Sequence, residues 1–178
     1  AVVMEDKTGL KKNSLNETTS SQKQEKIKNF CEKIEQINKS KLNDEFMVIA
    51  RIESFILEKG LKDAFLRARK YVEAGANGIM IHSKSKKPDE IFKFAKLFRK
   101  YNKDLPLVCV PSTYNSVKEK KLIEQKFNIV IYANQLFRAA YPAMQSTAKS
   151  ILINGRSKEI DKKLISIKDI LKLIPGTS

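Results

Sequence analysis

Short runs of apolar residues recur along the chain, separated by longer stretches in which apolar residues return with a helical period. Three of these runs are nearly continuous and rich in β-branched side chains, which is typical of strands in a parallel sheet covered on both faces. The five runs that we interpret as strands are Ala1–Met4, Phe46–Ile52, Gly78–Ile81, Leu105–Val110 and Ile129–Ala133.

The stretches between the runs place apolar residues three or four positions apart, and this spacing gives an amphipathic helix one apolar stripe. Gly75 favours the end of one such helix. Pro88 fits the first position of the next helix, where a missing N–H costs nothing. Helices are therefore expected at Gln24–Asn38, Leu61–Ala74, Asp89–Lys100, Ser116–Lys126, Gln135–Leu152 and Lys158–Leu173.

The strict alternation of strand and helix predicts right-handed parallel crossovers and an α/β fold within a single domain, residues 1–178. Two architectures satisfy the pattern: an open doubly wound sheet, or about strands 4–8 of an eight-stranded (β/α)8 barrel. No glycine-rich phosphate turn follows any strand, so the dinucleotide-binding form of the open sheet has little support. A partial barrel is at least as well supported, and its sites would lie at the carboxyl ends of the strands.

The formal net charge of +15 requires an interpretation, because basic domains can bind nucleic acid. Here the lysines are spread over nearly every predicted helix and are interleaved with acidic residues. The sequence has neither an aromatic-plus-basic recognition motif nor cysteines and histidines at zinc spacing. We therefore interpret the lysines as solvated helix faces and expect no nucleic-acid partner.

Other features of the sequence indicate the cellular compartment. No apolar run approaches the ~20 residues that a membrane helix needs, and the first residues lack the pattern of a signal peptide. Two cysteines, Cys31 and Cys109, are too few for a disulfide framework. These observations favour the cytoplasm. The apolar run that opens at Ala1 without a polar lead-in resembles a strand entered halfway, so we expect the chain to be a fragment of a longer protein.

Polar residues follow the predicted strands where each strand ends. Arg51 and Glu53 close the second strand, two positions apart and therefore on one face, and His82, the only histidine in the sequence, follows the third. An arginine presents a fixed fork of donors to a phosphate or carboxylate, and a neighbouring histidine can donate a hydrogen bond or move a proton. We expect an anion site here, in which Glu53 pins Arg51 or balances charge near a metal.

The segment after the first strand has the composition of a lid that closes over an anion. It contains Gly9, two lysines and the polar pair Asn13 and Ser14, followed by a low-complexity stretch, Asn16–Gln22. Mobile loops of this kind often complete sites at strand ends. We therefore predict a gating loop over residues 5–22.

Several motifs together resemble one enzyme family. They are Glu5-Asp6-Lys7-Thr8-Gly9-Leu10-Lys11-Lys12-Asn13-Ser14-Leu15, Ala50-Arg51-Ile52-Glu53, Ile81-His82-Ser83-Lys84, Tyr132-Ala133-Asn134, Arg138-Ala139-Ala140 and Ala143-Met144. In order and separation they resemble the phosphoenolpyruvate mutase family of the isocitrate lyase superfamily, over essentially the whole chain. The resemblance implies the C-terminal portion of a (β/α)8 barrel.

The resemblance also implies an activity and partners. The family interconverts phosphoenolpyruvate and phosphonopyruvate, small-molecule substrates, with Mg²⁺ as the cofactor, and so moves a phosphoryl group between oxygen and carbon. It forms homo-oligomers, dimers or tetramers, in which a C-terminal helix packs on a neighbouring barrel. By this resemblance, the helices within residues 135–178 make the oligomer contacts.

By resemblance, Arg51 and His82 hold the phosphoryl or phosphonate group, and Asn13, supported by Ser14, positions it when the loop closes. Lys11 adds positive charge near the site. Two acids complete the implied site. Glu5 would hydrogen-bond metal-bound water, and Glu53 would organise the polar residues nearby as a second outer-shell candidate.

The chain also departs from the family. The family's direct metal ligands and catalytic Asp have no counterpart here, so this chain alone should be inactive. Carbon–carbon lyases of the superfamily carry a Cys and a His in the loop, where this chain has Lys11-Lys12-Asn13-Ser14, which argues against a lyase. Phosphonopyruvate hydrolase resembles the mutase but tends to have a hydroxyl residue in place of Asn13, so Asn13 favours the mutase. The other alternative is a non-catalytic fragment or binding module.

Overall fold

The computed structural model describes residues 1–9, 14, 22–174 and 176. It divides the chain into two compact units, Ala1–Ala133 and Asn134–Ser178, which we describe separately. The expectation that residues 1–178 form a single domain stays a prediction.

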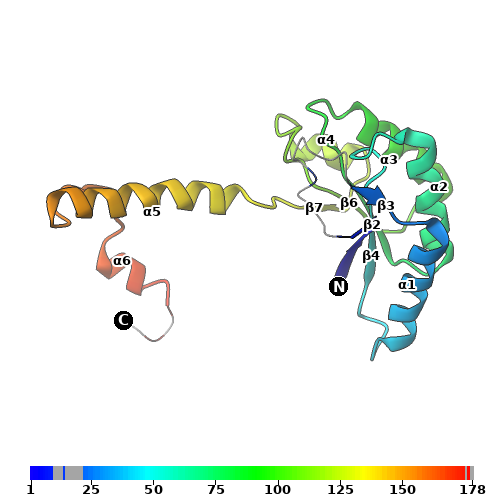
Figure 1. Ribbon diagram of the computed structural model, residues 1–178, viewed down its shortest axis with the longest axis horizontal. Helices are drawn as coiled ribbons and strands as arrows, with labels where there is room; N and C mark the ends of the chain where they lie inside the picture. Colours follow the sequence, from blue (N-terminus) through cyan, green and yellow to red (C-terminus); the bar gives the residue numbers. More distant parts are fainter. Residues whose placement is uncertain (10–13, 15–21, 175, 177–178) are drawn as a thin grey trace. The chain divides into compact units, whose positions relative to one another are not determined.

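The first unit is built on a five-stranded parallel sheet with the order β1-β4-β5-β6-β7 (Figure 1). All four neighbouring pairs are parallel. The strands follow one another across the sheet in sequence order, with no point at which the order reverses. A doubly wound sheet has such a reversal, so the sequential order favours the barrel. The strands are β1 (Val2–Glu5), β4 (Val48–Ile52), β5 (Gly78–Ile81), β6 (Leu107–Cys109) and β7 (Ile129–Val130).

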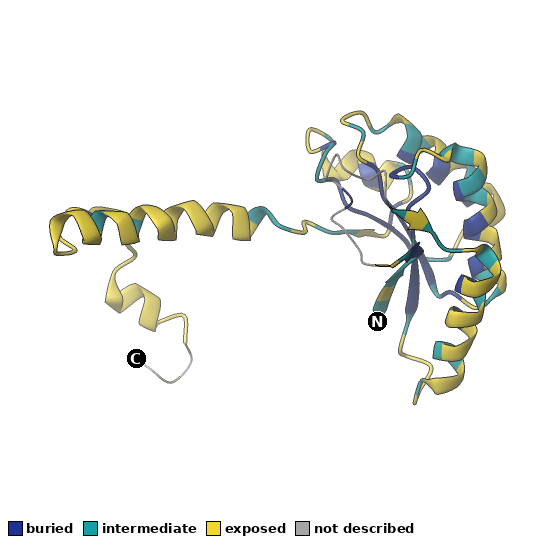
Figure 2. Ribbon diagram, viewed as in Figure 1, coloured by how far each residue is buried: buried dark blue, intermediate teal, exposed yellow. Residues whose placement is uncertain are grey.

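Helices α1, α2 and α3 lie along one side of this sheet (Figure 1). Alternate strand residues, such as Ala50 and Ile79, point to this side and join the helices in the main apolar core. Figure 2 shows the buried residues concentrated in the sheet and on the inward side of the helices. Within the described residues of this unit the α-helices are α1 (Ile27–Ser40), α2 (Gly60–Glu73), α3 (Asp89–Tyr101) and α4 (Glu119–Glu124).

The other side of the sheet carries a smaller apolar cluster that contains Ile49 and Met80. Successive side chains of a strand alternate between faces. Arg51 and Glu53 therefore follow Ile49 on this face, and His82 follows Met80. The fold thus places the three predicted strand-end residues on one side of the sheet, at its carboxyl edge.

Two predicted helix starts in this unit were three residues too early. Gln24 belongs to a two-residue strand, β3 (Lys23–Gln24), which pairs antiparallel with β2 (Lys7–Thr8), and α1 begins only at Ile27. Helix α4 begins at Glu119 rather than at residue 116, because the preceding Lys118 is extended. The predicted stop at Gly75 is confirmed: its φ is +97°, a conformation that glycine adopts readily.

The second unit contains the long helix α5 (Gln135–Asn154), which ends at Gly155 in the left-handed conformation. The single helix predicted at Lys158–Leu173 was wrong. That stretch forms a 3-10 turn, Asp161–Lys163, and a short helix, α6 (Ile167–Leu171). The Ser166 hydroxyl accepts from the Asp169 N–H and so starts α6 separately. None of the helices in the described part of the chain is long and apolar enough to cross a membrane.

Candidate active site

Six polar side chains from four segments meet at the carboxyl edge of β1, β4 and β5. They lie on the sheet face opposite the helices or reach it from residue 14, and hydrogen bonds or ion pairs connect them all. We call this group the strand-end cluster; its members are Glu5, Lys7, Ser14, Arg51, Glu53 and His82.

Arg51 is the first of the two cations of the strand-end cluster. Its Nε donates to Glu53 Oε1 at 2.8 Å. Its Nη2 lies 2.8 Å from His82 Nδ1 and 2.9 Å from Ser14 Oγ. The side chain keeps 23% of its surface exposed. The guanidinium is therefore held in one orientation while part of it still faces outward, as binding an anion requires.

Lys7 is the second cation, and its side chain is fully buried. Its Nζ lies 2.9 Å from both Glu5 Oε1 and Ser14 Oγ, and 3.3 Å from Glu53 Oε2. A buried ammonium group is costly unless it is paired and hydrogen-bonded. The two carboxylates meet that requirement and fix Lys7 between β1 and β4.

The Ser14 hydroxyl lies between the two cations. Its oxygen accepts from Lys7 Nζ and Arg51 Nη2, both at 2.9 Å, and its proton goes to Glu53 Oε2 at 2.5 Å. A single oxygen thus receives two charge-assisted hydrogen bonds. The Ser14 oxygen marks the point on which the positive donors of the cluster converge.

Glu53 is fully buried, yet it is held as a carboxylate. Burial alone would raise the pKa of Glu53. The opposing effects of His82, Arg51 and Ser14 are larger and hold the pKa well below its ordinary value of 4.5. An ionised Glu53 balances the positive charge of Arg51 and Lys7 and keeps both oriented.

The Nδ1 atom of His82 lies near both Arg51 and Glu53. Arginine has no acceptor, so the 2.8 Å contact from Arg51 requires an Nδ1 without a proton, and the ring then carries its proton on Nε2. A protonated Nδ1 would instead donate to Glu53 Oε1, at 3.4 Å. One protonation state cannot make both contacts. Which of the two groups His82 contacts through Nδ1 therefore depends on which ring nitrogen carries the proton.

The structure brings together five of the seven residues predicted for the site: Glu5, Ser14, Arg51, Glu53 and His82. Lys11 and Asn13 lie outside the described residues, so their roles stay predictions.

Sequence reasoning missed two residues of the same region. Lys7 follows Glu5 by two positions, and the alternation rule places both on one face. Asp6, between them, points to the opposite, helix-covered side. The rule that paired Arg51 with Glu53 would therefore have found Lys7, whereas the partners that bury Asp6 come from the distant helix α2.

A direct metal site is not formed within the described ranges, where no three histidine, cysteine, aspartate or glutamate side chains come close enough to hold a metal ion. Glu5 and Glu53 already face Lys7, and Glu53 also faces Arg51. These carboxylates suit hydrogen bonds to metal-bound water better than direct coordination. The donors present do not make up a complete metal site.

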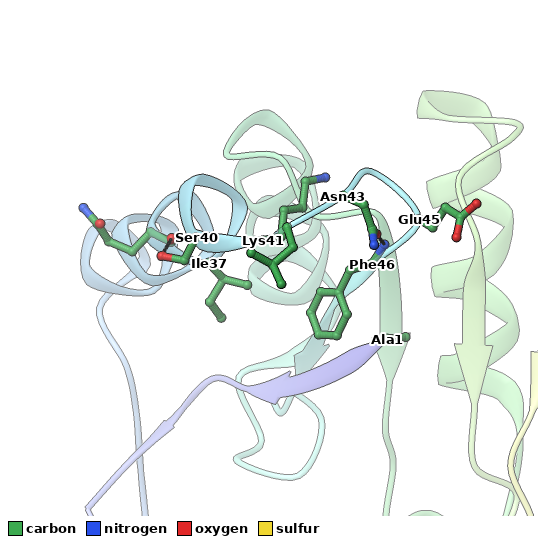
Figure 3. Close-up of a pocket in the computed structure, with 9 residues that line it drawn as sticks. Ala1, Ile37, Ser40, Lys41, Asn43, Glu45 and Phe46 are labelled. Carbon is green, nitrogen blue, oxygen red and sulfur yellow. Dashed lines mark hydrogen bonds between the residues drawn. The ribbon is translucent and has the colours of Figure 1, made fainter.

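A pocket of about 640 Å³ lies elsewhere on this unit. Figure 3 shows Ala1, Ile37, Lys41 and Phe46 around it. Ala1 precedes β1 and Phe46 precedes β4, so the pocket is at the amino ends of these strands. In barrel enzymes that end serves stability, and the chemistry lies at the carboxyl ends. We therefore place the candidate site at the strand-end cluster.

A sequential parallel sheet with a polar cluster at its carboxyl edge is typical of barrel-type α/β enzymes that bind anions. The profile of the phosphoenolpyruvate phosphomutase family matches residues 1–152, and the chain belongs to this family. The family predicted from the sequence motifs is confirmed.

Two relatives with different names are similar to the chain in sequence. It is 39% identical to phosphonopyruvate hydrolase of Variovorax sp. (strain Pal2), over 97% of this chain and 59% of the hydrolase. It is 34% identical to phosphoenolpyruvate phosphomutase of Tetrahymena pyriformis, over 97% of this chain and 56% of the mutase. The chain thus spans a little over half the length of these relatives.

Solved structures confirm the α/β fold class. Phosphoenolpyruvate phosphomutase from Streptomyces platensis subsp. rosaceus superposes with a TM-score of 0.86 and 32% identity, over 96% of this chain and 58% of that one. A phosphonopyruvate hydrolase in complex with oxalate and Mg²⁺ gives a TM-score of 0.81 at 37% identity, over 96% of this chain and 57% of that one.

Proposed function

We propose that this chain holds the phosphoryl or phosphonate group in an enzyme that interconverts phosphoenolpyruvate and phosphonopyruvate. Membership of the family supports the substrate class. One geometric observation carries the proposal: Arg51 Nη2 and Lys7 Nζ converge on a single oxygen, that of Ser14, at 2.9 Å each. A phosphonate oxygen accepts hydrogen bonds from the same kind of donors, and more strongly because it is charged.

The chemistry explains why such a cluster is useful. In the interconversion the phosphorus–oxygen bond of phosphoenolpyruvate breaks and a phosphorus–carbon bond forms at the methylene carbon. The transferring group carries negative charge on its three remaining oxygens, so catalysis depends on positioning and on fixed positive charge. Arg51, oriented by Glu53 and in contact with His82, provides that charge in a pre-set direction.

Mg²⁺ belongs to the proposal as well. A solved phosphonopyruvate hydrolase similar to this chain is in complex with Mg²⁺ and oxalate. When bound, the ion would neutralise charge on the substrate's oxygens. We propose that Glu5 and Glu53 act only from the outer shell, because both are already engaged by Lys7.

Phosphonopyruvate hydrolase is the second candidate function. The hydrolase of Variovorax shares 39% identity with the chain, against 34% for the mutase of Tetrahymena. Asn13 favours the mutase, since hydrolases tend to have a hydroxyl residue there. We propose mutase activity, and the experiment must distinguish it from hydrolase activity.

The test is turnover of phosphonopyruvate by the full-length protein that contains this chain, with Mg²⁺ in ¹⁸O-labelled water and ³¹P NMR as the readout. A mutase yields phosphoenolpyruvate whose three non-bridging phosphoryl oxygens all come from the phosphonate group and none from solvent. A hydrolase yields inorganic phosphate that carries one ¹⁸O atom. Arg51→Ala should abolish either reaction while the protein stays folded. Absence of any turnover by the unmodified protein would contradict both activities.

We also propose that the second unit forms contacts between copies in a homo-oligomer. Helix α5 has no buried residue along its length, as Figure 2 shows. It exposes large apolar side chains, among them Leu136 at 88% and Leu152 at 83%. Apolar surface of this kind is typical of an interface. Sedimentation of the chain with both leucines changed to asparagine would test this: the proposal predicts a smaller species than the unmodified chain forms.

A further inference from the structure

A second polar network lies directly behind the strand-end cluster, on the helix-covered side of the sheet. At its centre is Asp6, whose side chain is fully buried. The proposed chemistry does not use this carboxylate, and nothing in its position gives it access to a substrate. A buried carboxylate in a fold of this size requires an explanation, because removing its charge from water is unfavourable.

Asp6 holds the main chain of the segment that carries Arg51 and Glu53. The Asp6 N–H donates to the Arg51 carbonyl at 3.1 Å, and Asp6 Oδ1 accepts from the Glu53 N–H at 2.9 Å. Between these two points lies Ile52, which is anchored in the core. The two bonds therefore set where the backbone turns from β4 into the next loop, and with it the directions of the Arg51 and Glu53 side chains.

The other carboxylate oxygen connects Asp6 to α2 and β3. Asp6 Oδ2 accepts from the Tyr71 hydroxyl and from Gln24 Nε2, both at 2.8 Å, and from Arg67 Nη1 at 3.3 Å. Arg67 is in turn fixed by Asp63 at 2.9 Å. Helix α2 thus aims two donors at one oxygen of Asp6.

Arg67 also reaches the chain segment that follows β3. Its Nη1 donates to the Glu25 carbonyl at 2.9 Å, and the Glu25 N–H donates to the Asp6 carbonyl at 2.8 Å. Asp6 and Arg67 therefore tie together the end of β1, the end of β4, the end of β3 and helix α2.

The pKa shifts of Asp6 and Tyr71 fit a network whose groups keep fixed hydrogen-bonding roles. Burial raises the pKa of Asp6, and the Glu53 N–H, Tyr71 and Arg67 act in the opposite direction. Burial and the neighbouring Asp6 raise the pKa of Tyr71, so its hydroxyl keeps its proton and donates. Replacing Asp6 alone by an apolar residue would leave the Glu53 N–H, Arg67 and Tyr71 without this acceptor.

We propose that Asp6, held by Tyr71 and Arg67, is a positioning residue that sets the geometry of Arg51, Glu53 and His82. The geometry itself is independent of the substrate. Its consequence for substrate binding rests on the proposed function.

The test uses the 178-residue chain with ¹⁵N-labelled histidine, in which His82 gives the only imidazole signals. Tyr71→Phe removes one oxygen and Asp6→Asn removes the charge. We expect both variants to shift the ring nitrogen signals of His82 and to weaken phosphonopyruvate binding, by about 5-fold for Tyr71→Phe and more for Asp6→Asn.

Two control variants separate positioning from loss of stability. Glu73→Gln changes an exposed residue of α2, and Ile91→Val weakens the core on α3 without touching the network. Neither should shift the His82 signals. Unchanged His82 signals in Tyr71→Phe and Asp6→Asn, with only a lower melting temperature, would overturn the proposal.

The His82 signals and phosphonopyruvate binding together distinguish the positioning role of Asp6 from the proposed function. If Asp6→Asn does not fold, Tyr71→Phe decides alone, because phenylalanine keeps the shape of the ring. If the unmodified chain binds no phosphonopyruvate while Tyr71→Phe still shifts the His82 signals, the proposed function fails and the positioning role stands.

Discussion

Removal of Arg51 should show how strongly the strand-end cluster is coupled. In Arg51→Ala the fully buried Glu53 carboxylate would keep Ser14 at 2.5 Å, Lys7 at 3.3 Å and His82 Nδ1 at 3.4 Å as polar partners in the cluster. Loss of one partner from a buried ion pair costs about 3–5 kcal/mol. The guanidinium is partly exposed and these partners of Glu53 stay, so we expect a loss of about 2–3 kcal/mol in the free energy of unfolding.

A double-mutant cycle isolates the interaction from the general effects of truncation. Arg51→Ala, Glu53→Gln and the double variant are compared by urea unfolding, followed by circular dichroism at neutral pH. Because the neutral amide introduced by Glu53→Gln needs no cation, the double variant should be more stable than the sum of the single losses implies, by about 1.5–3 kcal/mol.

The matched control is an exposed pair at a similar distance. Lys70 and Glu73 on α2 lie 2.7 Å apart and are both largely solvated. The same cycle there should give about 0.3–0.5 kcal/mol. Additive losses at Arg51 and Glu53, with a coupling no larger than in this control, would refute the reasoning that the buried carboxylate depends on Arg51.

Three further predictions follow from the same contacts. The folded-state pKa of Glu53 lies below 4.5, so the stability it contributes is present above that pH and lost below it; between about pH 5 and pH 3, stability should fall more steeply in the unmodified chain than in Glu53→Gln. Equal slopes would contradict this. Lys7→Met should lower the free energy of unfolding by about 2 kcal/mol or more, since two carboxylates lose a buried cation; a loss under about 0.5 kcal/mol would argue against it. Burial raises the pKa of the Cys109 thiol to about 12, so iodoacetamide should modify the half-buried Cys31 first, and both equally in urea. Faster modification of Cys109 in the folded chain would count against its burial.

The regular parts of the fold could be predicted because their signals are local. Gly78–Ile81 is apolar at every position, and the prediction matched its strand at both ends. Strand alternation also placed Arg51 and Glu53 on one face. These inferences needed only the period of a strand and the parallel order.

The missed features depend on contacts between distant residues. Gln24 was assigned to a helix, because nothing near it shows that it pairs with Lys7. Asp6 has no local signal of burial, since the residues that stabilise it, Arg67 and Tyr71, come from α2. Such networks become visible only when the chain is folded.

The central claim is that the strand-end cluster holds a phosphonate group through Arg51 and His82. The most direct measurement is a titration of the ¹⁵N-histidine-labelled chain with phosphonopyruvate, with pyruvate as the ligand that lacks the phosphonate. We predict a saturable shift of the single imidazole, absent with pyruvate and absent in Arg51→Ala. No shift with phosphonopyruvate, or the same shift with pyruvate or in Arg51→Ala, would contradict the claim.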